Sequence, residues 1–174
     1  TRHGQTEWNL LKKVQGKADI ELNEKGIQQA EETRDFLKNE KIDLILCSPL
    51  KRALQTAEII NQGRNIRMII DERVSERDFG EFEGKNYAQL NGDPRYQAWI
   101  DSGGTMKFPG GEDPEEFRKR CVRGFEKVIK ECRHDKIKSV AVVAHGGTIM
   151  SIMERYAVKE DGTPAGSYYD YQIK

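Results

Sequence analysis

Two short, unbroken apolar runs constrain the fold of this chain more than any other feature. They are IDLILC at 42–47 and SVAVVAH at 139–145, and each is bounded by polar residues. A strand covered by side chains on both faces has this composition, whereas a strand with one wet face alternates apolar and polar residues. A third candidate strand is IRMII at 66–70. These runs predict a parallel sheet buried inside the molecule.

Helical periodicity appears between and after these runs. Ser48 and Pro49, directly after the first run, are suitable as the cap and the first residue of a helix. We predict three other helices: one after the cap residue Asn23, with Ile27, Ala30, Arg34 and Leu37 on one face and apolar support from Phe36, one at about 113–133, and one at 146–158. The tail at 167–174 has the composition of a strand.

Buried strands that alternate with amphipathic helices are typical of a three-layer α/β/α sandwich around a mostly parallel sheet. No linker or repeat interrupts the 174 residues, so we expect a single domain over 1–174. The stretch 76–112 is irregular, rich in glycine and aromatic residues, and longer than an ordinary connection. We interpret it as a lid-like insertion with short helices of its own. We also expect a strand ahead of Thr1, leading into the polar residues that open the sequence.

The composition narrows the functional classes. Lys plus Arg and Asp plus Glu number 29 each, which argues against nucleic acid or a membrane surface as a partner. No apolar run approaches the roughly 20 residues of a membrane span. Two of the three cysteines, Cys121 and Cys132, lie about 16 Å apart if they share one helix, too far to form a disulfide. Unpaired cysteines predict a reducing, cytoplasmic location. The sequence leaves the oligomeric state open, and a homodimer is compatible with it.

Three polar groups stand at predicted strand ends, where ligands bind in open α/β sheets. They are Arg2-His3-Gly4, Ser48-Pro49 with Arg52, and His145-Gly146-Gly147. Gly146 and Gly147 expose backbone N–H groups at the start of a helix, which attracts anions, and an arginine can grip a tetrahedral oxyanion. Each residue alone has an ordinary alternative, a structural histidine beneath a loop or a solvated arginine on a helix. Together they predict an anion site.

Glu76 opens the acidic and aromatic stretch ERDFGEFEG and is a candidate proton donor for a leaving alkoxide, with Glu81 or Glu83 next in line. The neighbouring GEFEGK is not a phosphate-binding P-loop, because three residues separate its glycines and no Ser or Thr follows Lys85. No cluster of aspartates has the spacing of a magnesium site. We therefore expect neither a metal nor a cofactor.

These motifs together resemble the histidine phosphatase superfamily, in the branch of the cofactor-dependent phosphoglycerate mutases and related small phosphatases. The chain carries RHGQTEWN, ADIELNEKGIQQA, CSPLKRALQTAEII, ERDFGEFEG, FPGGED and VAHGGTI in the order of the family's motifs. It departs from the family pattern at Asn23, where Ser or Thr is usual. The chain is most similar to small bacterial phosphatases such as the α-ribazole phosphatases.

The resemblance implies a role for each matching residue. His3 is the nucleophile that forms a phosphohistidine, and Glu76 protonates the leaving oxygen and later deprotonates water. Phosphoryl oxygens are held by a group of side chains: Arg2, Arg52, His145 and, assisting them, Asn9. More peripheral pocket residues are Gln5, Thr6, Gln15 and Gly16, together with the backbone of Gly146.

The sequence favours a phosphatase acting on a small phosphomonoester over a mutase. Family mutases carry a longer, more basic insertion and an asparagine where this chain has Gly147, although ERDFG is similar to the mutase motif ERHYG. A catalytically silent, ligand-binding relative is the third interpretation, and the complete residue set argues against it. Four aromatic residues of the irregular stretch either contact the substrate's organic part or form a satellite core: Tyr87, Tyr96, Trp99 and Phe108.

Overall fold

The computed structural model describes residues 1–135 and 137–172. Its elements, with η marking short 3-10 helices, are α1 (Glu7–Leu10), α2 (Glu24–Leu37), β1 (Leu44–Cys47), α3 (Lys51–Asn61), β2 (Arg67–Ile70), η1 (Glu72–Val74), η2 (Gly80–Phe82), α4 (Tyr87–Leu90), α5 (Pro94–Asp101), α6 (Pro114–His134), β3 (Val140–Val143), α7 (Gly146–Tyr156) and η3 (Tyr168–Tyr171).

The three predicted apolar runs form one parallel sheet in the order β2-β1-β3. Leu44 of β1 lies opposite Arg67 of β2 and Val140 of β3. The opening residues continue the sheet beyond β3, because Arg2 pairs in parallel with Ala144 and the His3 N–H donates to the Ala144 carbonyl at 3.0 Å. All strand ends therefore point to one edge.

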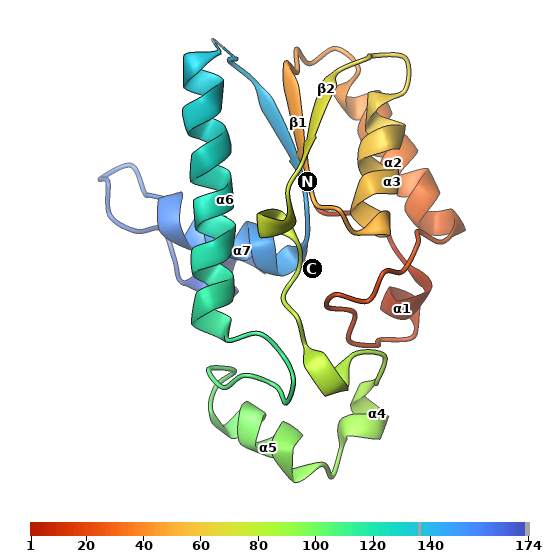
Figure 1. The fold of residues 1–174 in the computed structure, drawn as a ribbon, viewed down its shortest axis with the longest axis vertical. Coiled ribbons are helices and arrows are strands. Elements are labelled where there is room, and N and C mark those ends of the chain that lie inside the picture. Colours follow the sequence, from red (N-terminus) through yellow and green to blue (C-terminus); the bar gives the residue numbers. More distant parts are fainter. Residues whose placement is uncertain (136, 173–174) are drawn as a thin grey trace.

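Alternating side chains of β1 serve the two faces of the sheet. Ile45 and Cys47 pack against α3, whereas Leu44 and Leu46 pack with Val128 and other residues of α6. In Figure 1 the sheet lies between α6 on one side and α2 with α3 on the other. The predicted three-layer α/β fold with a parallel sheet is confirmed.

Two helix predictions need correction. Ser48 is not the N-cap of α3, which begins at Lys51 behind Leu50; the Ser48 hydroxyl accepts from the Leu50 N–H at 3.3 Å and lies 2.7 Å from the His145 ring. Asn23 does cap α2, accepting from the Gly26 N–H at 2.9 Å. On the face predicted for α2, Ala30 is buried and Leu37 packs against the core, whereas Ile27 and Phe36 are exposed, so the prediction holds at the first two positions and is wrong at the other two.

The predicted strand in the tail is also wrong over the residues that can be described. Residues 168–171 form η3, because the Asp170 carboxylate accepts from the Ser167 N–H at 2.7 Å and from its hydroxyl at 2.9 Å. This local capping box outweighs the strand preference of the tyrosines. Residues 173–174 of the predicted strand lie outside the described residues.

The stretch 76–112 contains η2, α4 and α5, so the short helices expected there are present, and it lies beyond the strand ends (Figure 1). A second apolar cluster is built from Phe82, Leu90 and Phe108, with Tyr96 and Trp99 packed against it. Tyr87 is exposed. Three of the four aromatic residues singled out in the sequence thus form a satellite core.

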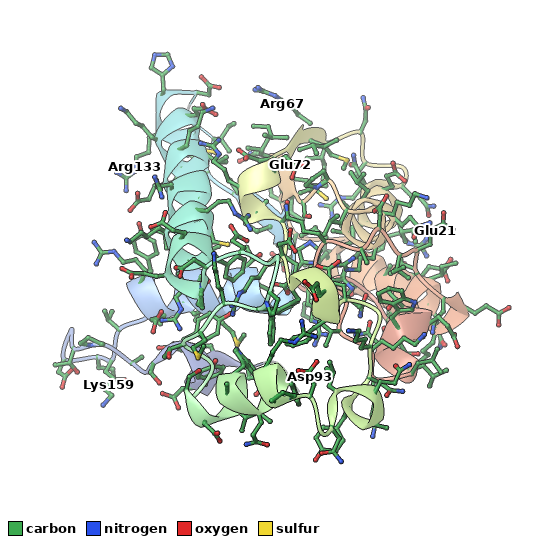
Figure 2. The ribbon with its side chains drawn as sticks, turned by 60° about the horizontal axis from the view of Figure 1, so that its bottom comes forward. Glu21, Arg67, Glu72, Asp93, Arg133 and Lys159 are labelled. Atoms are coloured by element: carbon green, nitrogen blue, oxygen red, sulfur yellow. The ribbon has the colours of Figure 1, made fainter. Side chains whose placement is uncertain are left out.

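The outside of the molecule is charged, and in Figure 2 Glu21, Arg133 and Lys159 lie at its periphery. All three cysteines are buried and unpaired, as expected. Within 1–135 and 137–172, no helix combines the length and apolar character that crossing a membrane requires.

Candidate active site

The predicted polar groups meet at the carboxyl edge of the sheet. His3 lies beside the end of β3, His145 directly follows that strand, and Ser48 directly follows β1. Arg52 enters from the first turn of α3, and Glu76 comes after β2 and η1. Because parallel strands end at the same edge, residues more than 140 positions apart become neighbours.

His3 is buried and its ring is held in one orientation. Its Nδ1 lies 2.7 Å from the Gly4 carbonyl oxygen, which can only accept a hydrogen bond, so Nδ1 carries the proton of the neutral ring. Burial lowers the pKa of His3 to about 3, with smaller contributions from Arg52 and Arg2, and the bond to the Gly4 carbonyl opposes the shift. His3 is therefore neutral at physiological pH, with an unprotonated Nε2.

His145 is fully buried against His3, with ring centroids 5.2 Å apart. Its Nε2 lies 2.7 Å from the Ser48 hydroxyl. For its Nδ1, the described part of the chain offers no hydrogen-bond partner. Burial, followed by the charge of Arg52, holds the pKa of His145 well below its ordinary value. The site therefore contains two neutral imidazoles in contact.

Arg52 is the main buried cation, with only 1% of its surface exposed. Its two terminal nitrogens donate to the Gly16 and Ala18 carbonyls at 2.7 Å each. Its Nε is buried, and none of the described residues accepts a hydrogen bond from it. Burial lowers the pKa of Arg52, and the nearby carboxylates of Glu76, Asp19 and Glu83 oppose that shift. The guanidinium remains charged, as arginine does throughout proteins.

Glu76 is fixed by two backbone N–H groups. Arg77 donates to Oε1 at 3.0 Å, and Gly147 in the first turn of α7 donates to Oε2 at 3.2 Å. A Cβ at Gly147 would lie only 2.4 Å from Glu76 Oε1 and 3.0 Å from Phe117. Glycine at 147 therefore makes room for the carboxylate, a reason that the motif alone does not reveal.

The remaining predicted residues divide into two groups. Asn9, Thr6 and Gln15 are together, because the buried Thr6 hydroxyl lies 3.1 Å from Asn9 Oδ1 and 2.9 Å from Gln15 Oε1. Gln5 instead turns toward α2, where its N–H donates to Gln29 and its side-chain oxygen accepts from Asn23. The two glycines enter through their backbones: the Gly16 carbonyl binds Arg52, and Gly146 starts α7.

Two cavities flank this cluster. The first, of about 620 Å³, is lined by Arg2, His3 and Asn9 together with residues of α2. The second, of about 340 Å³, is lined by Glu76, Gln15 and Gly147 together with a largely aromatic wall that includes Phe79, Tyr96, Trp99, Phe108, Phe117, Tyr168 and Tyr169. The nucleophile candidate and the acid candidate therefore line different cavities, and neither Arg52 nor His145 is among the lining residues of these two.

Sequence reasoning missed two contacts of this site. Ser48 was expected to cap a helix, yet its hydroxyl is the partner of the His145 ring. Glu83 was considered only as a substitute acid, yet it accepts from two backbone N–H groups. Among the described residues, no group of three or more His, Cys, Asp or Glu side chains has a metal-binding arrangement.

Comparison with known proteins identifies the family. The sequence profile of the histidine phosphatase superfamily (branch 1) matches residues 1–165. The chain belongs to this superfamily, and the resemblance recognised in its motifs is confirmed.

Individual relatives agree with this assignment. The chain is 39% identical over 152 residues to an uncharacterized phosphatase, PhoE, of Bacillus subtilis, covering 87% of this chain and 72% of that protein. It is 36% identical over 157 residues to a 2,3-bisphosphoglycerate-dependent phosphoglycerate mutase of Cytophaga hutchinsonii, covering 87% and 73%. The crystal structure of the α-ribazole phosphatase from Shigella flexneri superposes with a TM-score of 0.87 at 26% identity, covering 99% and 83%. The expectation of a phosphatase enzyme is confirmed.

Proposed function

We propose that this protein hydrolyses small phosphomonoesters through a phosphohistidine on His3, without a metal ion. The observation that carries the proposal is the contact between His3 Nδ1 and the Gly4 carbonyl. It leaves Nε2 unprotonated in a ring that burial keeps neutral, which is the state in which an imidazole can attack phosphorus.

The first step transfers the phosphoryl group to the enzyme. The lone pair of His3 Nε2 forms a bond to phosphorus while the bond from phosphorus to the ester oxygen breaks. The protonated Glu76 carboxyl gives its proton to that leaving oxygen, which departs as an alcohol. Arg52, Arg2 and the His145 ring stabilise the charge on the phosphoryl oxygens, with Asn9 assisting. Gln5, Thr6, Gln15, Gly16 and Gly146 shape the surroundings.

The second step regenerates the enzyme. The Glu76 carboxylate takes a proton from water, the water oxygen bonds to phosphorus, and the bond from phosphorus to His3 Nε2 breaks. Inorganic phosphate leaves, and His3 and Glu76 return to their starting states. The fixed position of Glu76 on the Gly147 N–H supports this double role.

The second cavity suggests what kind of ester is bound. It adjoins Glu76, and its wall is rich in aromatic rings, with Arg77 and Arg118 beside them, which suits a flat, largely apolar group. We propose that the organic part of the substrate occupies it and that residues 76–112 act as a lid-like insertion over it within the single domain. The unpaired cysteines support a cytoplasmic location.

A mutase is the second candidate, favoured by the 36% identity to a phosphoglycerate mutase. Gly147 favours hydrolysis, because the mutases that this chain resembles carry an asparagine at this position, whereas a side chain here would press on the Glu76 carboxylate. The test incubates chelator-treated protein with p-nitrophenyl phosphate, then with 3-phosphoglycerate and 2,3-bisphosphoglycerate. We expect free phosphate from the first reaction. Isomerised phosphoglycerate in excess of free phosphate would establish the mutase instead, and a complete loss of turnover on chelation would overturn the metal-independent mechanism.

A further inference from the structure

Glu83 is an acidic residue whose carboxylate is turned to the inside of its loop. Its Oε1 accepts from the backbone N–H of Lys17 at 2.7 Å and from the backbone N–H of Phe79 at 3.0 Å. Glu81, two residues earlier, is the opposite case, because its side chain is 57% exposed and pairs with Arg95 on the surface. A single oxygen of Glu83 thus joins two loops that are about 60 residues apart in the chain.

The first of these loops is the one that Arg52 holds. The guanidinium donates to the Gly16 and Ala18 carbonyls, and the N–H that Glu83 accepts from belongs to Lys17, between them. The Lys17 N–H and the Gly16 carbonyl belong to one planar peptide unit, so fixing the position of this N–H also fixes that carbonyl. The orientation of the Arg52 guanidinium therefore depends on Glu83 through the backbone.

The second loop leads from the candidate acid to the aromatic cavity. Phe79 lies three residues after Glu76 and lines that cavity. The contact from Glu83 to the Phe79 N–H closes the turn over 79–83. Glu83 consequently touches both the loop behind the cation and the loop behind the acid.

Gly16 is shaped to admit this carboxylate. A Cβ at Gly16 would lie 2.0 Å from Glu83 Oε1 and 2.9 Å from the Phe79 ring, and its φ of +52° falls in the left-handed region. Glycine is therefore required at 16 both for its conformation and for the approach of Glu83.

We propose that Glu83 is a positioning residue for phosphoryl transfer. One of its oxygens binds both the loop that Arg52 contacts and the loop that carries Glu76. The distance between the phosphoryl-binding Arg52 and the acid Glu76 therefore stays fixed. This role requires an acceptor oxygen that reaches both N–H groups and does not require titration of Glu83. The inference rests on the proposed function, which assigns Arg52 and Glu76 to the reaction.

Two substitutions distinguish the effect of the length of the Glu83 side chain from the effect of its charge. Glu83→Gln keeps the length of the side chain and an acceptor oxygen but removes the charge. Glu83→Asp keeps the charge but is one methylene too short to reach both N–H groups. Glu81→Gln and Glu81→Asp are the matched controls on the exposed side of the same loop. Circular dichroism verifies that all four variants are folded.

The measurements are equilibrium binding of inorganic phosphate and kcat/KM for p-nitrophenyl phosphate. We expect Glu83→Asp to weaken phosphate binding about tenfold and to lower kcat/KM on the order of 100-fold, as a misplaced group does. Glu83→Gln should stay within about threefold of the wild type with an unchanged pH profile, because its amide oxygen replaces the carboxylate oxygen. Both Glu81 variants should match the wild type.

Several results would overturn the role of Glu83. The first is a Glu83→Asp variant that binds phosphate as tightly as the wild type. The second is a Glu83→Gln variant that loses as much phosphate binding and kcat/KM as Glu83→Asp does. The others are a Glu83→Asp variant that does not fold while Glu83→Gln is inactive, and wild-type protein that binds no phosphate. Failure of the proposed function looks different: wild-type protein would bind phosphate and hydrolyse no ester, and the binding comparison would still decide the role of Glu83.

Discussion

On one side of the candidate active site, His3 and His145 lie at the ends of hydrogen-bonded strands, whereas on the other side Glu76 lies in a loop and the aromatic cavity is lined by loops and helices. The first side is buried and its imidazoles are neutral. On the second side, the backbone N–H groups of Arg77 and Gly147 hold the Glu76 carboxylate in the space that glycine at 147 leaves. The position of the nucleophile His3 therefore depends on the sheet, whereas the position of the acid Glu76 depends on the space left by the missing side chain at Gly147.

Removing the nucleophile should have the largest effect on turnover. We expect His3→Ala to lower kcat by at least about 10⁴-fold, because residues that act as one catalytic unit lose most of their effect together. His134→Ala is the control, since the His134 side chain is 91% exposed at the end of α6. If His3→Ala kept more than a hundredth of the wild-type kcat, His3 would not be the nucleophile.

Adding one methyl group at Gly147 tests how the position of the acid Glu76 depends on the space around it. Gly147→Ala should displace the Glu76 carboxylate and lower kcat by roughly 10- to 100-fold, the usual effect of a misplaced catalytic group. Gly146→Ala is the matched control, because nothing lies within 4 Å of a Cβ at that position. Steady-state kinetics of the two variants compare them directly. Equal kcat values in both would show that the acid does not depend on the space at 147.

The buried imidazole should also make stability depend on pH. The pKa of His3 is about 3 in the folded protein and about 6.5 when unfolded, so the unfolded state binds more protons between these values. Stability should therefore fall as the pH drops below 6.5, by up to about 1.4 kcal/mol per pH unit for this group. Urea unfolding of wild type and His3→Gln at pH 7, 6, 5 and 4 measures the effect. Parallel curves for the two proteins would contradict the buried neutral ring.

The smallest effect is expected at the outer wall of the aromatic cavity. Tyr169 lines the cavity but is 53% exposed, so Tyr169→Ala should fold normally. We expect it to raise KM for 1-naphthyl phosphate about 3- to 10-fold, through loss of apolar contact, while KM for glycerol phosphate stays constant. Tyr87→Ala, exposed and outside the cavity, is the control. Equal changes for both esters would show that the cavity does not hold the organic group.

The comparison of the two sides also explains what the sequence could predict. His3, Arg52 and His145 were expected at one place because strand ends are visible as apolar runs followed by polar residues, and parallel strands end at a common edge. Ser48 was misread as a helix cap because its partner His145 is 97 residues away. Local propensity cannot detect such a contact.

Other errors have equally local causes. The tyrosines of η3 have strand preference, but the Asp170 capping box decides their conformation. The face predicted for α2 includes Ala30, which is buried, but also Ile27 and Phe36, which are exposed, and it omits Gly26, which is buried. Gly26 is buried because its Cα approaches the backbone of Gln5 so closely that a Cβ would lie 2.0 Å from the Gln5 carbonyl oxygen. Periodicity counts apolar side chains and therefore overlooks the contact that this helix makes through Gly26.

Transfer of the phosphoryl group to His3 is the central step of the mechanism and requires both His3 and the Glu76 side of the site. The substitution Glu76→Gln separates this step from the later hydrolysis of the phosphohistidine. Glutamine can still accept from the Gly147 N–H but cannot activate water, so the variant should accumulate an acid-labile phosphoenzyme after mixing with p-nitrophenyl phosphate. Peptide mass spectrometry at alkaline pH should then find the phosphoryl group on His3. A Glu76→Gln protein that turns over normally, or a phosphoryl group on any other residue, would contradict the mechanism.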